Sequence, residues 1–124
     1  MDKEIIKNLT ELYIQEIQEH YGMSKHHASF PYIYIEDSPY SDAEHKTIKG
    51  EFSHMENDIN VYWKNIKTEE DLIRTLLHEY KHYLQSPAWM TRYYKQGYTY
   101  TDHPYEVQAR EEEENWHKFK INRL

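Results

Sequence analysis

The chain has 124 residues, which suits one domain and is too short for two separate cores, so we expect a single domain over residues 1–124. Its formal net charge of −7 argues against a nucleic-acid partner, because proteins that bind phosphates present a basic surface. The absence of cysteine excludes disulfides, thiolate metal sites and a cysteine nucleophile, which leaves His, Asp and Glu as the strong metal ligands.

The N-terminal part of the chain predicts one helix followed by one strand. Between Asp2 and Tyr21 apolar residues recur at helical spacing, and Gly22 stands where such a helix would end. The segment 30–36, FPYIYIE, is rich in aromatic and β-branched residues and is soon followed by Pro39, so it predicts a strand. The charged start matches neither a signal peptide nor a membrane span, so we expect a cytoplasmic protein with no membrane partner.

A hairpin is predicted next. The segments 48–55 and 59–65 flank Glu56, Asn57 and Asp58, residue types that are common in hairpin turns. Together with the preceding strand, the hairpin predicts a three-stranded antiparallel sheet.

A second helix is predicted from about Glu69 to Gln85. Thr68 precedes three acidic residues, 69–71, in a capping pattern that places negative charge in the first helical turn, where the helix dipole favours it. Pro87 should stop this helix, since proline cannot continue one.

A last helix is predicted after the tyrosine-rich connector 93–102. Pro104 suits its first position, His103 suits its cap, and the helix should extend toward Phe119. The acidic run 111–114 is most simply explained as a solvated face of this helix. The expected fold class is α+β: an N-terminal helix, a small antiparallel sheet with a hairpin, and two further helices.

The second predicted helix carries the sequence LLHEYKHYLQ, in which His78, Glu79 and His82 form a His-Glu-x-x-His motif. A chain with nine histidines can contain this motif by chance, so its setting must decide. On a helix, the apolar residues from Leu72 to Leu84 form one stripe, and the two histidines lie on the opposite side, one turn apart. The spacing therefore presents two imidazoles together from a rigid element, as a metal site requires.

A catalytic zinc ion usually has three protein ligands and one open position, so a third ligand is needed. Glu106 at the start of the last helix is the leading candidate, followed by His103 and then Asp102. Ala109 would let this helix approach the motif helix closely. Glu106 has an alternative role, because an acid at this position can also reach back to cap its own helix.

On these residues the chain resembles the zincin metallopeptidases, and more closely their gluzincin branch. The predicted order of elements is similar to that of the minigluzincins and of the metallopeptidase domain of ImmA/IrrE-type proteins. The resemblance implies that His78, His82 and Glu106 bind Zn²⁺. It also implies that Glu79 is the general base.

The chain departs from the gluzincin pattern at Arg110. Many gluzincins have an Asp there, four residues after the ligand glutamate, to orient a zinc-binding histidine. Glu113 or a backbone carbonyl could take that role. Glu113 and His117 share the helical face of Glu106, but a solvated face explains them as well, so they are left out of the predicted site.

The predicted function is zinc-dependent hydrolysis of a peptide or protein substrate, with Glu79 activating a zinc-bound water. The transition-state oxyanion needs one further donor, for which Tyr98, Tyr100 and His103 are candidates. An unpaired edge of the hairpin region could hold an extended peptide by strand addition. Two alternatives are a zinc-binding regulator or scaffold without peptidase activity, and an acidic interaction protein for which metal is irrelevant.

Overall fold

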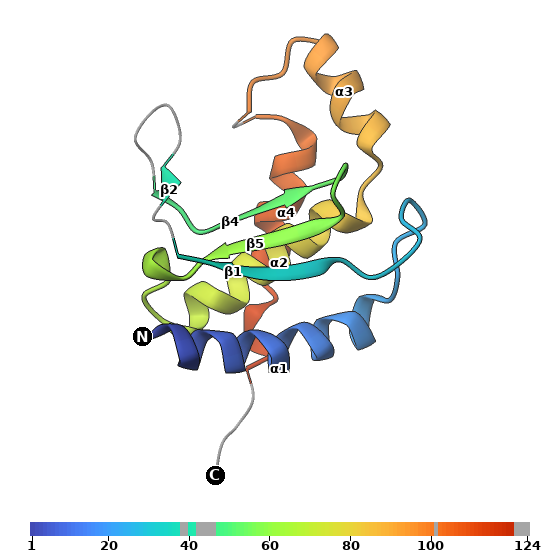
Figure 1. The fold of residues 1–124 in the computed structure, drawn as a ribbon. Coiled ribbons are helices and arrows are strands. Elements are labelled where there is room, and N and C mark those ends of the chain that lie inside the picture. Colours follow the sequence, from blue (N-terminus) through green and yellow to red (C-terminus); the bar gives the residue numbers. More distant parts are fainter. Residues whose placement is uncertain (38–39, 42–46, 101, 121–124) are drawn as a thin grey trace.

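The computed structural model describes residues 1–37, 40–41, 47–100 and 102–120, and its elements confirm the α+β fold class (Figure 1). The helices are α1 (Lys3–Tyr21), α2 (Glu69–Leu84), α3 (Pro87–Lys95) and α4 (Pro104–Glu113), with short 3-10 helices η1 (Trp63–Asn65) and η2 (Trp116–Lys118). The strands are β1 (Tyr32–Glu36), β2 (Tyr40–Ser41), β3 (Thr47–Ile48), β4 (Gly50–Ser53) and β5 (Asp58–Tyr62). Among the described helices, none is long and apolar enough to cross a membrane.

The main sheet has the strand order β1-β5-β4. The predicted hairpin is confirmed, since β4 and β5 are antiparallel, and Asn57 in their turn has a φ of 52°, which asparagine tolerates. Pro39, which the sequence places after the first strand, lies outside the described residues.

The prediction of a fully antiparallel sheet is wrong at β1, which pairs with β5 in parallel. The end of β1 and the start of β4 lie at the same end of the sheet, because Glu36 pairs with Tyr62 and Gly50 with Val61. The chain thus reverses between β1 and β4, but β5 takes the central place between them. This strand is the most buried of the three, with Ile59 and Val61 fully buried.

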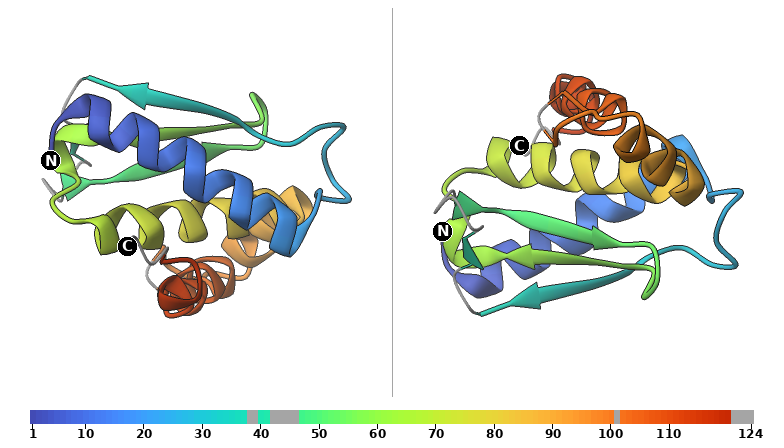
Figure 2. Two further views of the ribbon diagram at one scale, coloured as in Figure 1. Left: turned by 90° about the horizontal axis from the view of Figure 1, so that it is seen from below. Right: turned by 90° about the horizontal axis from the view of Figure 1, so that it is seen from above.

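One core holds α1, α2 and the sheet together. It contains Ile6, Leu9, Tyr13, Ile14, Ile17, Ile59, Val61, Ile66, Leu72, Ile73, Leu76, Leu77, Tyr80, Tyr83 and Phe119. Helix α1 covers one face of the sheet, and α2 packs against both the edge strand β4 and helix α4 (Figure 2). The apolar stripe of α2 therefore faces the core, while its motif side faces α4.

The predicted start and end of α2 are confirmed. The Thr68 hydroxyl accepts a hydrogen bond from the Asp71 backbone N–H at 3.1 Å, which caps the helix as the sequence suggests. Pro87 follows the end of α2, but it also begins α3, which the sequence did not predict. None of the residues of α3 is buried, and its nine residues give only a short pattern by which a helix could be recognised.

The last helix is shorter than predicted, because α4 ends at Glu113 and η2 follows. The turn in the chain brings Phe119 onto the core, where its ring stacks with that of Tyr21 at 6.0 Å between centroids. Ala109 is fully buried, and α4 packs along α2 there as its small side chain predicts.

Candidate metal centre

The side chains of the motif come together where α2 packs against α4. The metal-binding atoms of His78, Glu79 and His82 all lie within 4.8 Å of one another. Glu79 and His82 are only 7% and 5% exposed, so the site is largely shielded from bulk water. The helical spacing read from the sequence is thus sufficient to place these three side chains together.

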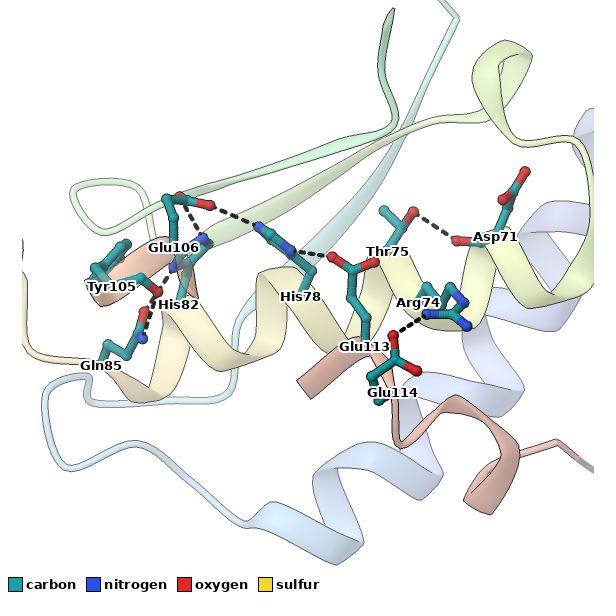
Figure 3. A network of polar contacts seen from close by, with 10 residues as sticks. All are labelled: Asp71, Arg74, Thr75, His78, His82, Gln85, Tyr105, Glu106, Glu113 and Glu114. Carbon is teal, nitrogen blue, oxygen red and sulfur yellow. Dashed lines mark hydrogen bonds and ion pairs between the residues drawn. The ribbon is translucent and has the colours of Figure 1, made fainter. Parts of the chain in front are cut away.

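The carboxylate of Glu106 faces both histidines of the motif (Figure 3). Its Oε1 lies 2.9 Å from His82 Nε2, and its Oε2 lies 3.1 Å from His78 Nε2. The alternative role of Glu106 as a helix cap is filled instead by His103, whose Nδ1 accepts the Tyr105 backbone N–H. Two imidazole nitrogens and one carboxylate therefore converge from two helices.

The second nitrogen of each imidazole is also held in place. His78 Nδ1 lies 2.7 Å from a Glu113 carboxylate oxygen, and His82 Nδ1 lies 2.8 Å from Gln85 Oε1. Gln85 is in turn fixed, because its amide donates to the Tyr105 carbonyl at 3.0 Å. Nδ1–H groups that donate to these oxygens leave the Nε2 lone pairs available to a metal.

Sequence reasoning did not identify Gln85, and it named Glu113 only as one of two options. The one signal for Gln85 is its place three residues after His82, at the end of α2. Glu113 lies seven residues after Glu106, hence two turns along the same face of α4. The His78 ring lies between these two carboxylates, each of which contacts one of its nitrogens.

The interpretation of the acidic run as a solvated face is wrong for Glu112 and Glu113, which are half-buried. The Tyr21 hydroxyl donates to Glu112, and Glu113 contacts His78. Glu114 is exposed but forms an ion pair with Arg74 at 3.2 Å. These contacts arise because the end of α4 packs beside α1 and α2, which a composition argument does not anticipate.

The charges in the site are strongly coupled. Burial alone would raise the pKa of Glu106, but its bonds with His78 and His82 outweigh burial and lower this pKa to about 2. Burial alone would lower the pKa of His78, but hydrogen bonds with Glu106 and Glu113 raise it to about 10. Burial raises the pKa of Glu79, which favours uptake of a proton.

This donor set fits a divalent transition metal. Two neutral imidazoles and one carboxylate are the protein ligands of many catalytic zinc sites, whereas Mg²⁺ and Ca²⁺ prefer oxygen ligands alone. A protonated His78 would balance the charge of Glu106, and a bound cation would take over that role. The residues present therefore fit Zn²⁺ through His78 Nε2, His82 Nε2 and Glu106.

His103 and Asp102, the other candidates for the third ligand, are used elsewhere. His103 is fully buried, its Nε2 donates to the Met90 carbonyl at 2.9 Å, and its Nδ1 caps α4. Asp102 is exposed and accepts a hydrogen bond from the Thr99 hydroxyl at 3.2 Å. The same contacts remove His103 from the candidate oxyanion donors.

Of the two tyrosines predicted as oxyanion donors, Tyr100 reaches the site. Although 62% of its surface is exposed, partial burial together with the nearby carboxylates of Glu106 and Glu79 raises the pKa of its hydroxyl. Tyr98 is 43% exposed and packs edge-on against Tyr93, with 5.4 Å between ring centroids.

Comparisons of the chain with protein-family models, curated proteins and solved structures gave no match. The resemblance to gluzincins therefore rests on the motif of α2, the glutamate of α4 and the order of the elements.

Proposed function

We propose that the protein is a zinc-dependent peptidase. His78, His82 and Glu106 would hold the metal, and Glu79 would be the general base. The observation that carries the proposal is the convergence of both Nε2 atoms on the Glu106 carboxylate, while both Nδ1 atoms are held by oxygen acceptors. When bound, zinc supplies a Lewis acid and lowers the pKa of water to about 7.

The side chains around the ligands support hydrolysis of an amide bond. Glu79 is positioned to take a proton from the attacking water and to pass it to the departing amine, and burial raises its pKa toward the range that suits this exchange. The Tyr100 hydroxyl, whose pKa is raised in part by the nearby Glu106, would donate to the oxyanion that forms on the substrate carbonyl.

The edge strand β4 is suited to hold a peptide substrate. Among the described strands it pairs only with β5, and it packs directly on α2. A Cβ atom on Gly50 would lie 3.3 Å from Glu79 Cγ, so the strand passes next to the proposed base. A peptide that adds to the free edge of β4 would therefore have its backbone beside Glu79.

Replacement of Gly50 with Ala tests how closely β4 must approach α2. The added Cβ would lie 2.6 Å from Thr75 Cγ2, so the strand or the helix must shift, and we expect a loss of about 1–3 kcal/mol in the free energy of unfolding. Chemical denaturation measures this loss. The double variant Gly50→Ala/Thr75→Ser lacks the clashing methyl group, so it should recover most of the stability. Unchanged stability in the single variant would contradict the close packing.

Metal removal tests the proposed function directly. Purified protein should contain about one zinc ion per chain, and a chelator should abolish its hydrolysis of a peptide library, which added zinc should restore. Elemental analysis and mass spectrometry of the digested library measure the two effects. Hydrolysis that persists in metal-free protein would contradict the proposal.

A zinc-binding protein without peptidase activity is the second candidate, since Arg110 stands where many gluzincins have an acid. Stoichiometric zinc without turnover of any peptide would favour it. If the protein binds zinc and His82→Ala loses it, the alternative of an acidic interaction protein for which metal is irrelevant is contradicted.

A further inference from the structure

A hydrogen-bonded chain of three side chains lies next to the site and has no role in the reaction described above. His27 Nε2 lies 3.0 Å from His54 Nδ1, and His54 Nε2 lies 2.7 Å from the Tyr105 hydroxyl. The Tyr105 ring stacks on the ring of His82, with 4.3 Å between centroids and an interplanar angle of 14°. The chain thus ends directly against one of the proposed ligands.

The two histidines are not arranged as a second metal site. Their ring centroids are 5.2 Å apart and their planes differ by 5°, while the two nitrogens are 3.0 Å apart. Rings so placed are nearly coplanar and face each other edge to edge, so the two nitrogen lone pairs would point at each other. This is the geometry of an N–H···N hydrogen bond and not that of a chelate.

The bond between His54 and Tyr105 crosses the course of a peptide bound along β4. His54 directly follows Ser53, the last residue of β4, and Tyr105 lies in the first turn of α4. Helix α2 packs against both β4 and α4, and in Figure 2 β4 and α2 run across the view while α4 is seen nearly end-on beside α2. A peptide that extends along β4 above α2 would therefore meet the His54–Tyr105 pair just beyond Ser53.

The distances limit how much of a peptide fits on this side of the site. The His54 and Tyr105 ring centroids are 6.1 Å apart, and that of His82 is 4.3 Å from Tyr105. The His54 ring thus lies no farther than about 10 Å from His82, a length that an extended chain covers in about three residues. Strand β4 has four residues, which also limits the number of peptide residues that can pair with it.

The direction of strand pairing indicates which end of a peptide lies here. Antiparallel pairing is the more stable arrangement, and a peptide antiparallel to β4 has its N-terminus toward Ser53. The His54–Tyr105 pair does not repel a cationic α-amino group at neutral pH, since burial, with lesser effects of His27 and His82, lowers the pKa of His54 to about 4.

We propose that the protein is an aminopeptidase-type exopeptidase, which releases up to about three residues from a free N-terminus because the His54–Tyr105 pair closes that side of the site. This inference rests on the proposed peptidase function. In the reaction, water adds its hydroxyl to the carbonyl carbon, the C–N bond breaks, and the remaining proton goes to the departing nitrogen.

The test uses one peptide sequence in three forms: unmodified, N-acetylated and C-amidated. With zinc-loaded protein we expect short N-terminal fragments from the unmodified and amidated forms, and cleavage slowed at least about tenfold by acetylation. Mass spectrometry identifies the products. Equal cleavage of the acetylated form at internal bonds, or trimming from the C-terminus, would overturn the inference but leave the peptidase function intact. Failure to cleave any form would remove both.

Binding provides a readout that does not depend on turnover. Zinc-loaded Glu79→Gln protein should bind the unmodified peptide at least about tenfold more tightly than the acetylated one, as measured by calorimetry. His54→Ala should reduce this preference, and so should Tyr105→Phe, which keeps the ring stacked on His82. His26→Ala removes a neighbouring exposed histidine and should leave it unchanged. If both His54→Ala and Tyr105→Phe keep the preference for the unmodified peptide, the proposal that this pair closes the site is wrong.

Discussion

Replacement of Glu79 with Gln should lower the rate of peptide hydrolysis by about 10²–10⁴-fold while the zinc content stays unchanged. The amide keeps the size of the side chain and its packing beside Gly50, but it cannot accept the proton of the attacking water. Steady-state kinetics on a cleaved peptide and elemental analysis of the same preparation measure the two quantities.

Glu111→Gln is the matched control, because Glu111 is an exposed residue of α4 that undergoes the same chemical change. Its activity should equal that of the unmodified protein. Retention of full activity by Glu79→Gln would assign the base to another group. Loss of zinc in this variant would instead make Glu79 a ligand, which its place in the cluster with His78 and His82 would allow.

Replacement of Glu106 with Gln should weaken zinc binding more than any change outside the three proposed ligands. The variant loses the one anionic ligand, whose pKa of about 2 keeps it ionised throughout the neutral range. We expect an affinity loss of at least about 100-fold, measured by competition with a chromogenic chelator. Glu113→Gln should lose about tenfold, because an amide oxygen can still accept the His78 Nδ1–H.

His103→Ala is the comparison that tests the choice of ligand. Its zinc affinity should stay within about threefold of that of the unmodified protein, although the loss of the α4 cap should cost about 1 kcal/mol of stability. Zinc binding that survives Glu106→Gln but is lost in His103→Ala would contradict the proposed ligand set.

The departure of the chain from the gluzincin pattern has a structural explanation in α4. An acid at the position of Arg110 would lie about one turn after Glu106, whereas Glu113 lies about two turns after it on the same face. Its carboxylate reaches His78 Nδ1 at 2.7 Å while Glu106 contacts Nε2 of the same ring. In the proposed zinc site, Glu113 would orient His78 in place of an acid at position 110.

The sequence by itself determined the features that depend on neighbouring residues. The Thr68 cap and the apolar period predict α2, and the turn residues around Asn57 predict the hairpin. The helical spacing of His78 and His82 also follows from α2 alone, which is why the core of the candidate site could be identified without a structure.

Only the tertiary structure decided the features that depend on contacts between distant segments. It determined that β1 pairs in parallel with β5, that β4 is the edge strand next to α2, and that α3 interrupts the connector. It also placed Glu106 and Glu113 against His78 and turned His103 away toward Met90. Such contacts follow from the packing of α4 on α2 across more than 20 residues of chain, which local propensity and periodicity do not encode.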